Sequence, residues 1–285
     1  MRTRSLLLLV CVSLTAGTSG CAISQYLARP LRPRCVLPPT ITEQQLVAWL
    51  NQQTEQIRNW RSTDVRITSS SGGIPIRLSA VLAVERPANF RMMAKSIAGR
   101  EADLGSNQDQ FWFWMRRSEP KHVFSVRHEN MRTVGHQMQI PFEPDWLMQV
   151  LGVMPLPQGD AFLQPREPDS ELLALVIEGI GPSGEPTRRI IQVDSCYGRI
   201  ISQSLHDAGG NLLARATFND YKVCGETGVM LPHRIDLDWP QTRTAMSLHM
   251  GSIELNNPAL PQQLWTMPEI PGFPEMELGR NLHSQ

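Results

Sequence analysis

The sequence predicts a mainly β protein, an antiparallel meander that curls around a small number of helices. Short runs of strand-forming residues recur between tight turns along most of the chain, whereas helical periodicity is confined to two segments. In addition, residues 111–114 read Phe-Trp-Phe-Trp, so one strand carries large aromatic side chains on both faces. This stretch indicates a sheet that is covered on both sides, a hollow for an apolar ligand, or an exposed patch for a partner.

Two segments carry the signatures of helices. The first is predicted over 42–60, because Thr42 and Gln45 form a capping box and an apolar stripe follows at helical spacing. The second begins with Pro144 in its first turn. The first stripe consists of Leu46, Trp49, Leu50, Gln53, Ile57 and Trp60, and the second of Trp146, Leu147, Val150 and Leu151. Both stripes need an apolar surface, which the strands provide.

The strands are predicted in two groups separated by the second helix and a Pro-rich turn at 155–168. The first group comprises 64–70, 75–85, 88–96, 100–106, 110–117 and 121–127. The second comprises 171–179, 187–194, 199–206, 212–222, 232–239 and 243–255. The connections are short and the turns are tight, which favours antiparallel pairing between successive strands.

Residues 1–20 have the features of a lipoprotein signal peptide. Arg2 and Arg4 form a positive region, a short apolar run follows at 6–12, and small residues lead to Cys21. The apolar run is shorter than the roughly 20 residues of a transmembrane helix. Thr-Ser-Gly-Cys resembles a bacterial lipobox, which implies that Cys21 is acylated, for example with palmitate, and anchors the chain to a membrane. An ordinary cleavable signal peptide is the alternative.

The rest of the chain is predicted in three parts. Residues 21–41 form a lipid-anchored, Pro- and Arg-rich tether, 42–256 form the folded domain, and 257–285 form a Pro-rich extended tail that drapes over it. In bacterial lipoproteins an Asp after the acylated Cys retains the protein in the inner membrane, so Ala22 and the lipobox resemblance imply the outer membrane, facing the periplasm. The chain has 27 basic and 27 acidic residues, and the signal peptide takes two of the basic ones away. This balance excludes a nucleic-acid-binding surface.

No motif predicts catalysis, a metal or a cofactor. Gly179 to Gly184 match G-x-G-x-x-G, but Pro182, Pro186 and the strand that follows make this segment a hairpin loop. The seven histidines lack metal-binding spacings, and no nucleophile elbow or P-loop is present. The protein is therefore predicted to be non-enzymatic, with no catalytic residue, metal or cofactor.

Three cysteines remain after Cys11 leaves with the signal peptide and Cys21 takes the lipid. An exported protein keeps disulfides. Cys196 and Cys224 fall in turns at the same end of the predicted meander, so a disulfide between them is one prediction and two thiols are the alternative. Cys35 has no partner in that scheme.

Several short motifs point to one family. They are Arg86-Pro87 before Phe90-Arg91, residues 102–107 leading to 111–114, Val193-Asp194, Gly198-Arg199-Ile200, Asp207 with Gly210-Asn211, Tyr221 and Leu231-Pro232. Together they resemble the periplasmic lipoprotein carrier and receptor family, LolA and LolB, over roughly 42–256. The resemblance implies an incomplete, half-open antiparallel barrel with about two helices that cover or plug an apolar cavity.

The resemblance also implies a function and partners. In this family the cavity takes the acyl chains of lipoproteins, without a reaction or a cofactor. LolA is a soluble shuttle and LolB is a lipid-anchored acceptor, and the lipobox at Cys21 aligns with LolB. The expected partners are the membrane, through the N-terminal lipid, and a hydrophobic ligand or an acylated lipoprotein. The alternative function is an envelope interaction or stress-sensor module that binds a protein partner and carries no lipid.

The residues expected to line the cavity lie on strands of both groups. Methionine suits an adaptable lining, although ordinary core packing under the helices explains the same residues. The aromatic pairs of 111–114 divide between the hollow and a covering segment such as the tail with Trp265 and Phe273. The family's match through Trp114 favours the two tryptophans in the hollow. The predicted lining is Phe90, Met92, Trp112, Trp114, Leu237, Met246, Leu248 and Met250.

Overall fold

The structure is a computed structural model that describes residues 35–71, 74–134, 144–157, 161–165, 170–181, 184–226 and 228–279. The predicted signal peptide, Cys21 and most of the tether lie outside the described residues, and the division of the chain at 20, 41 and 256 stays a prediction. Among the described residues, no helix combines the length and the apolar composition needed to cross a membrane.

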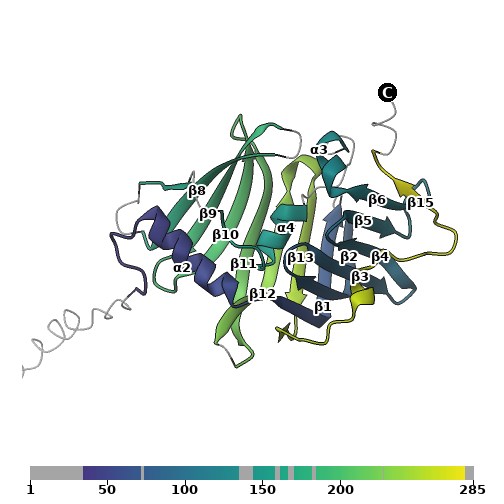
Figure 1. Cartoon of the computed structure of the whole chain (residues 1–285), viewed down its shortest axis with the longest axis horizontal. Coiled ribbons are helices and arrows are strands. Elements are labelled where there is room, and N and C mark those ends of the chain that lie inside the picture. The colour runs from purple at the N-terminus through teal and green to yellow at the C-terminus, as the bar shows by residue number, and fades with distance from the viewer. Residues whose placement is uncertain are drawn as a thin grey trace, which may run out of the picture. The chain divides into compact units, whose positions relative to one another are not determined.

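The body is one open sheet, as predicted. Its path runs β15-β6-β5-β4-β3-β2-β1-β13-β12-β11-β10-β9-β8-β7, and β14 pairs with β1. All pairs are antiparallel except β15 with β6. The end strands β15 and β7 do not pair with each other, so the sheet curls without closing (Figure 1). This is the incomplete, half-open barrel that the resemblance implied.

The strands of the sheet are β1 (Asn59–Ser71), β2 (Ile74–Glu85), β3 (Asn89–Ser96), β4 (Gly99–Ser106), β5 (Gln110–Met115), β6 (Val123–Arg127), β7 (Ala161–Leu163), β8 (Leu172–Ile180), β9 (Pro186–Asp194), β10 (Arg199–Asp207), β11 (Leu212–Cys224), β12 (Val229–Trp239), β13 (Thr244–Met250), β14 (Glu254–Leu255) and β15 (Glu275–Glu277). Each predicted strand is present with shifted ends. The predicted strand 243–255 is divided into β13 and β14. The two additions, β7 and β15, have too few residues to show an alternating pattern.

The helices are α2 (Glu43–Glu55), α3 (Met131–Val134) and α4 (Pro144–Val150), with 3₁₀ turns η1 (His128–Asn130), η2 (Pro240–Thr242) and η3 (Gln262–Trp265). The capping box of α2 is confirmed: Gln45 N donates to Thr42 Oγ1 at 3.3 Å, and Thr42 N donates to Gln45 Oε1 at 3.0 Å. The predicted end at residue 60 is wrong. Ile57 and Trp60 continue the helical spacing by coincidence, because they are buried by the turn into β1 and by β1 itself.

Two apolar clusters fill the concave side of the sheet. Figure 1 shows α2 across the strands of the second group and α4 nearer the middle of the sheet. The buried side chains of α2 pack on Leu173, Leu175 and Ile191 of β8 and β9. The buried side chains of α4 pack in the larger cluster, with residues from β1–β3 and β10–β13. Each helix therefore covers a different part of the concave side of the sheet.

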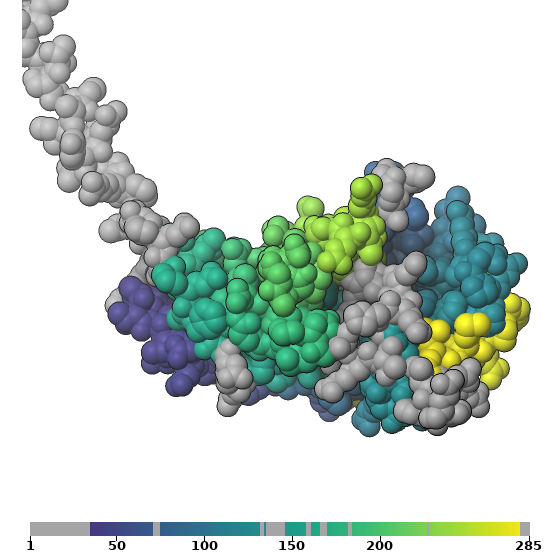
Figure 2. Space-filling model, turned by 90° about the horizontal axis from the view of Figure 1, so that it is seen from above, coloured from purple at the N-terminus to yellow at the C-terminus, as the bar shows by residue number. Residues whose placement is uncertain are grey.

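The segment 256–279, called the strap below, packs on the convex face of β3–β5. Figure 2 shows yellow atoms of its C-terminal part beside teal atoms of the first strand group. Trp265 is buried, and its carbonyl oxygen accepts a hydrogen bond from Asn107 Nδ2 at 3.2 Å. The strap ends as β15, which adds a parallel strand to β6. Ser125 Oγ donates to Glu275 there at 2.6 Å. The strap thus covers one face and one edge of the sheet.

The four aromatics of β5 lie in a part of the sheet that is covered on both sides. Phe111 packs on the concave side with Val126 and Val134. Trp112 and Trp114 lie on the convex side, where the ring of Phe273 in the strap meets Trp114 edge-on at 5.4 Å. The prediction that both tryptophans line the hollow is therefore wrong. The alternation of the strand separates the pairs correctly, but only the strap determines which face each pair occupies.

A glycine makes room for one of these tryptophans. Gly105 lies directly opposite Trp112 on β4, and a β-carbon at Gly105 would stand 2.1 Å from Trp112 Cζ2. The indole therefore lies flat over the glycine backbone, which lets the strap approach the sheet closely.

The predicted Cys196–Cys224 disulfide is wrong. Cys224 is a free, buried thiol, whereas Cys196 and Cys35 are disulfide-bonded. Cys196 follows β9 and Cys224 ends β11, so β10 lies between them. Two strand spacings are about 10 Å, which exceeds the roughly 7 Å between α-carbons that a disulfide can span. The curl of the sheet does not bring these cysteines together.

Candidate ligand-binding site

The candidate site is an apolar hollow on the concave side of the sheet, under α4. Strands β2, β3, β4, β12 and β13 supply its walls, and α4 with the residue that follows it supplies its roof. Every lining side chain is apolar. They are Leu82, Phe90, Met92, Leu104, Leu147, Leu151, Leu237, Trp239, Met246 and Leu248.

Strand alternation places the wall residues on one face. Leu82, Met92 and Leu104 are successive cross-strand neighbours on β2, β3 and β4. Leu237 and Met246 face each other in the same way on β12 and β13. Because the sheet curls, these two rows turn toward each other and toward α4.

Helix α4 occupies almost the whole hollow. Trp146 is 1% exposed, and its ring meets that of Trp239 edge-on at 6.2 Å. The free volume left at the site is about 20 Å³. That is space for about one water molecule and none for an acyl chain. An apolar ligand therefore needs α4 to move.

Two side-chain hydrogen bonds between described residues contact the region of α4. The indole N–H of Trp60 donates to the carbonyl oxygen of Leu151 at 2.9 Å, just beyond the helix. The guanidinium of Arg189 donates to the side-chain oxygen of Gln149. The buried side chains of α4 also pack in the larger apolar cluster, so packing contributes to its position.

The hollow includes five of the eight predicted lining residues: Phe90, Met92, Leu237, Met246 and Leu248. Met250 is buried in the same cluster but does not line the hollow. Trp112 and Trp114 lie on the opposite face, under the strap. The alternation along β2 and β4 could have identified Leu82 and Leu104. The i, i+4 spacing of Leu147 and Leu151 could have identified the residues of the roof.

The hollow has no charged lining, and its surroundings offer little chemistry. Cys224 lies in the same apolar cluster, where burial raises the pKa of its thiol and keeps it protonated. Within the described ranges, no group of three or more His, Cys, Asp or Glu side chains could hold a metal ion. The arrangement is suited to holding apolar groups.

The comparison with solved structures identifies the fold. A DUF1329 family protein from Desulfovibrio piger aligns over 79% of this chain and 95% of its own, with a TM-score of 0.54 and 10% identity. A LolA superfamily protein from Nitrosomonas europaea aligns over 80% and 98%, with a TM-score of 0.51 and 15% identity. This protein has a LolA-like fold.

A third structure agrees with this assignment. A candidate outer membrane lipoprotein-sorting protein domain from Vibrio parahaemolyticus aligns with the LolA-like chain over 76% of its length and 95% of the domain, with a TM-score of 0.51 and 12% identity. No family model matches the sequence, and no curated protein matches it. At identities this low the structures share the fold alone, so the function has to be argued from the site.

Proposed function

We propose that this LolA-like protein is a lipid-anchored, non-enzymatic envelope protein that binds acyl chains, alone or on lipoproteins, in the hollow of its half-barrel. The observation that carries the proposal is the wholly apolar lining of the hollow, whose roof is the short helix α4. Five side chains at and just after this short helix are almost wholly buried, and two side-chain hydrogen bonds between described residues contact it. An acyl chain would replace these apolar contacts with its own when α4 moves away. The five are Trp146, Leu147, Met148, Val150 and Leu151.

The composition of the hollow supports an apolar ligand of variable shape. Met92 and Met246 lie in opposite walls, and thioether side chains repack easily around different chains. No charged side chain lines the hollow, so nothing there would select a polar head group. We place that head group outside the hollow, in solvent.

The alternative is an envelope module on the same fold that binds a protein partner and carries no lipid. The free volume of about 20 Å³ favours it, because a permanently packed α4 would be ordinary core. Native mass spectrometry of protein purified in gentle detergent separates the two functions. Copurified lipid supports the acyl-binding function. A protein that stays empty after incubation with palmitate contradicts it.

We expect Trp60→Phe to increase the affinity for a fluorescent fatty acid about fivefold. The variant loses the hydrogen bond to Leu151, which stabilises the closed position of α4 by about 1 kcal/mol, while most of the buried ring area remains. If the closed position of α4 competes with the ligand, destabilising that position by about 1 kcal/mol makes binding more favourable by the same amount. Titration of the probe, with a denaturant curve for each variant, checks this result.

Trp49→Phe is the matched control. The Trp49 indole on α2 donates to Gly198 O at 2.8 Å, so the variant loses a similar bond away from the hollow. Its affinity should equal that of the wild type. Equal affinities in all three proteins, with a lower stability of both variants, would show that α4 is ordinary core.

The proposed anchor at Cys21 has a separate test. Growth with a radioactive or alkyne-tagged palmitate should label the mature protein, and Cys21→Ala should abolish the label and release the protein from the membrane fraction. Cys224→Ala is the control, because Cys224 is a free cysteine that lies far from the lipobox in the sequence. Labelling that survives Cys21→Ala would contradict the anchor without affecting the proposal for the hollow.

A further inference from the structure

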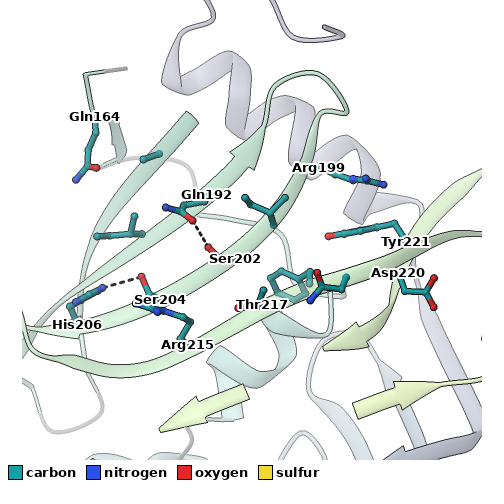
Figure 3. Close-up of a pocket in the computed structure, with 15 residues that line it drawn as sticks. Gln164, Gln192, Arg199, Ser202, Ser204, His206, Arg215, Thr217, Asp220 and Tyr221 are labelled. Carbon is teal, nitrogen blue, oxygen red and sulfur yellow. Dashed lines mark hydrogen bonds between the residues drawn. The ribbon is translucent and has the colours of Figure 1, made fainter. Parts of the chain in front are cut away.

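A second candidate site is a groove on the convex face of the sheet. Strands β8–β11 and the residue after β7 enclose an open groove of about 750 Å³ (Figure 3). Leu175 and Ile191 turn toward α2, whereas their strand neighbours Ala174 and Gln192 line the groove. Alternation thus places the groove on the face opposite α2, away from the hollow. Its volume lies within the range of small-molecule sites, about 300–1,000 Å³.

The lining of the groove is mostly polar. Hydroxyl and amide groups cover its floor, and two of them are joined where Ser202 Oγ donates to Gln192 Oε1 at 2.8 Å (Figure 3). His206 contacts Ser204 Oγ at 3.0 Å at one end. Groups that both donate and accept hydrogen bonds match the hydroxyls of a sugar. The polar lining includes Gln164, Gln192, Ser202, Ser204, Thr217 and Asn219.

Basic side chains outnumber acids in the lining. Arg199 and Arg215 both line the groove, and in the described part of the chain neither forms an ion pair with a carboxylate. The one acid in the lining, Asp220, is neutralised by Lys222 at 2.8 Å. The groove therefore complements a ligand that carries negative charge.

Two acids face the arginines from neighbouring strands without lining the groove. Asp238 lies opposite Arg215 on β12, and Asp194 lies opposite Arg199 on β9. The carboxylate of Asp194 accepts hydrogen bonds from two backbone N–H groups of the turn after β9, at 2.8 and 3.1 Å. Asp194 is therefore engaged with its own turn, and Arg199 is the cation most available to a ligand.

Two tyrosine rings hold Arg199 in position. Its guanidinium carbon lies 4.5 Å from the ring centre of Tyr197 and 4.8 Å from that of Tyr221. Tyr221 is fixed in turn, because its hydroxyl donates to Ile200 O at 2.6 Å and burial raises the pKa of the phenol. An arginine held between two rings loses little side-chain entropy when it binds an anion.

We propose that this groove binds an acidic saccharide, with its carboxylate or phosphate on Arg199 and its hydroxyls along the floor of β9–β11. The floor of the groove is formed by β9–β11, which are paired on both sides, so it offers no free strand edge with which a peptide could pair. The lining of hydroxyls and amides therefore favours a sugar over an acidic peptide. This proposal does not depend on acyl binding in the hollow.

Calorimetric titration of the mature protein in detergent with tri-galacturonic acid tests the proposal. Binding should weaken about ten- to a hundredfold in Arg199→Gln, the range expected for hydrogen bonds to a charged group. The control Arg188→Gln should bind like the wild type, because Arg188 is exposed on the same face but pairs with Glu178 outside the groove. Tyr197→Phe should retain binding and Tyr197→Ala should weaken it, which separates positioning of Arg199 from folding.

Three results would overturn the proposal. The first is no binding of tri-galacturonic acid by the wild type. The second is equal binding of the neutral sugar maltotriose, since the charge of the ligand would then play no part. The third is equal competition by inorganic phosphate or by a peptide of glutamates, which would show a general anion site.

Discussion

Arg91→Met is expected to lower the free energy of unfolding by about 3–5 kcal/mol and to release the strap. Arg91 is 5% exposed and forms a bidentate ion pair with Asp103, at 2.7 and 2.9 Å. Its third guanidinium nitrogen, Nη1, donates to the carbonyl oxygens of Leu264 and Thr266, at 3.2 and 2.5 Å. One side chain thus joins two strands to the strap. Methionine fills a similar volume but leaves the carboxylate and both carbonyls without this donor.

Two measurements separate the loss of stability from the loss of the strap. Denaturant unfolding gives the free energy, and limited proteolysis should cut the strap within 256–274 much faster than in the wild type. The tryptophan emission should also shift to longer wavelength, because the strap covers Trp112 and Trp114. Arg100 still contacts Asp103 at 2.5 Å from the surface, so part of the charge compensation remains.

The exposed pair of Arg188 and Glu178 is the control for Arg91. Its N–O distance is 2.9 Å, but the side chains are 53% and 44% exposed, so Arg188→Met should cost less than about 1 kcal/mol. Adding Asp103→Leu to Arg91→Met should recover part of the stability, since the uncompensated charge is removed. A cost for Arg91→Met as small as that of Arg188→Met would show that the strap is held by its apolar contacts alone.

Strand content could be predicted because its signal is local. Alternation along β2, β3 and β12 marks the residues that face the hollow, which is why Phe90, Met92 and Leu237 were identified correctly. Alternation assigns two sets of residues to two faces, but it does not say which face is concave. For β5, the face that each pair of aromatics occupies depends on the contacts of the strap through Phe273 and Arg91. These two residues are far apart in the sequence. The two tryptophans were therefore placed on the wrong side.

Other errors also arose where distant residues decide the structure. Trp60 continues the spacing of α2, yet β1 begins before it and its indole bonds to Leu151. Cys196 and Cys224 lie at the same end of the meander, but the strand between them keeps them apart. The occupation of the hollow by α4 could not be predicted either, because an amphipathic stripe shows that a helix packs and not how deeply. The groove around Arg199 was missed because its side chains come from four strands.

Trp146→Ala is expected to lower the free energy of unfolding by about 3–5 kcal/mol and, in the same protein, to open the hollow to palmitate. The side chain of Trp146 fills the space between α4 and Trp239, and it is 1% exposed. Its removal leaves a cavity lined by Trp239 and the walls of the hollow. An acyl chain can occupy that cavity without the full displacement of α4, so the variant should bind palmitate more tightly than the wild type.

Thermal unfolding with and without palmitate measures both effects. A ligand at about 100 times its dissociation constant stabilises the folded state by about 2.7 kcal/mol, which would restore most of the loss. Trp265→Ala is the control, because Trp265 belongs to the strap, is 5% exposed and lies away from the hollow. It should lose similar stability and gain nothing from palmitate.

The pattern across the two variants distinguishes the functions. Rescue of Trp146→Ala alone places the apolar ligand under α4. Rescue of neither variant would mean that α4 covers ordinary core, and the protein-partner function would then be favoured. Rescue of both variants would mean that palmitate binds elsewhere on the protein, since Trp265 and Trp146 lie on opposite faces of the sheet.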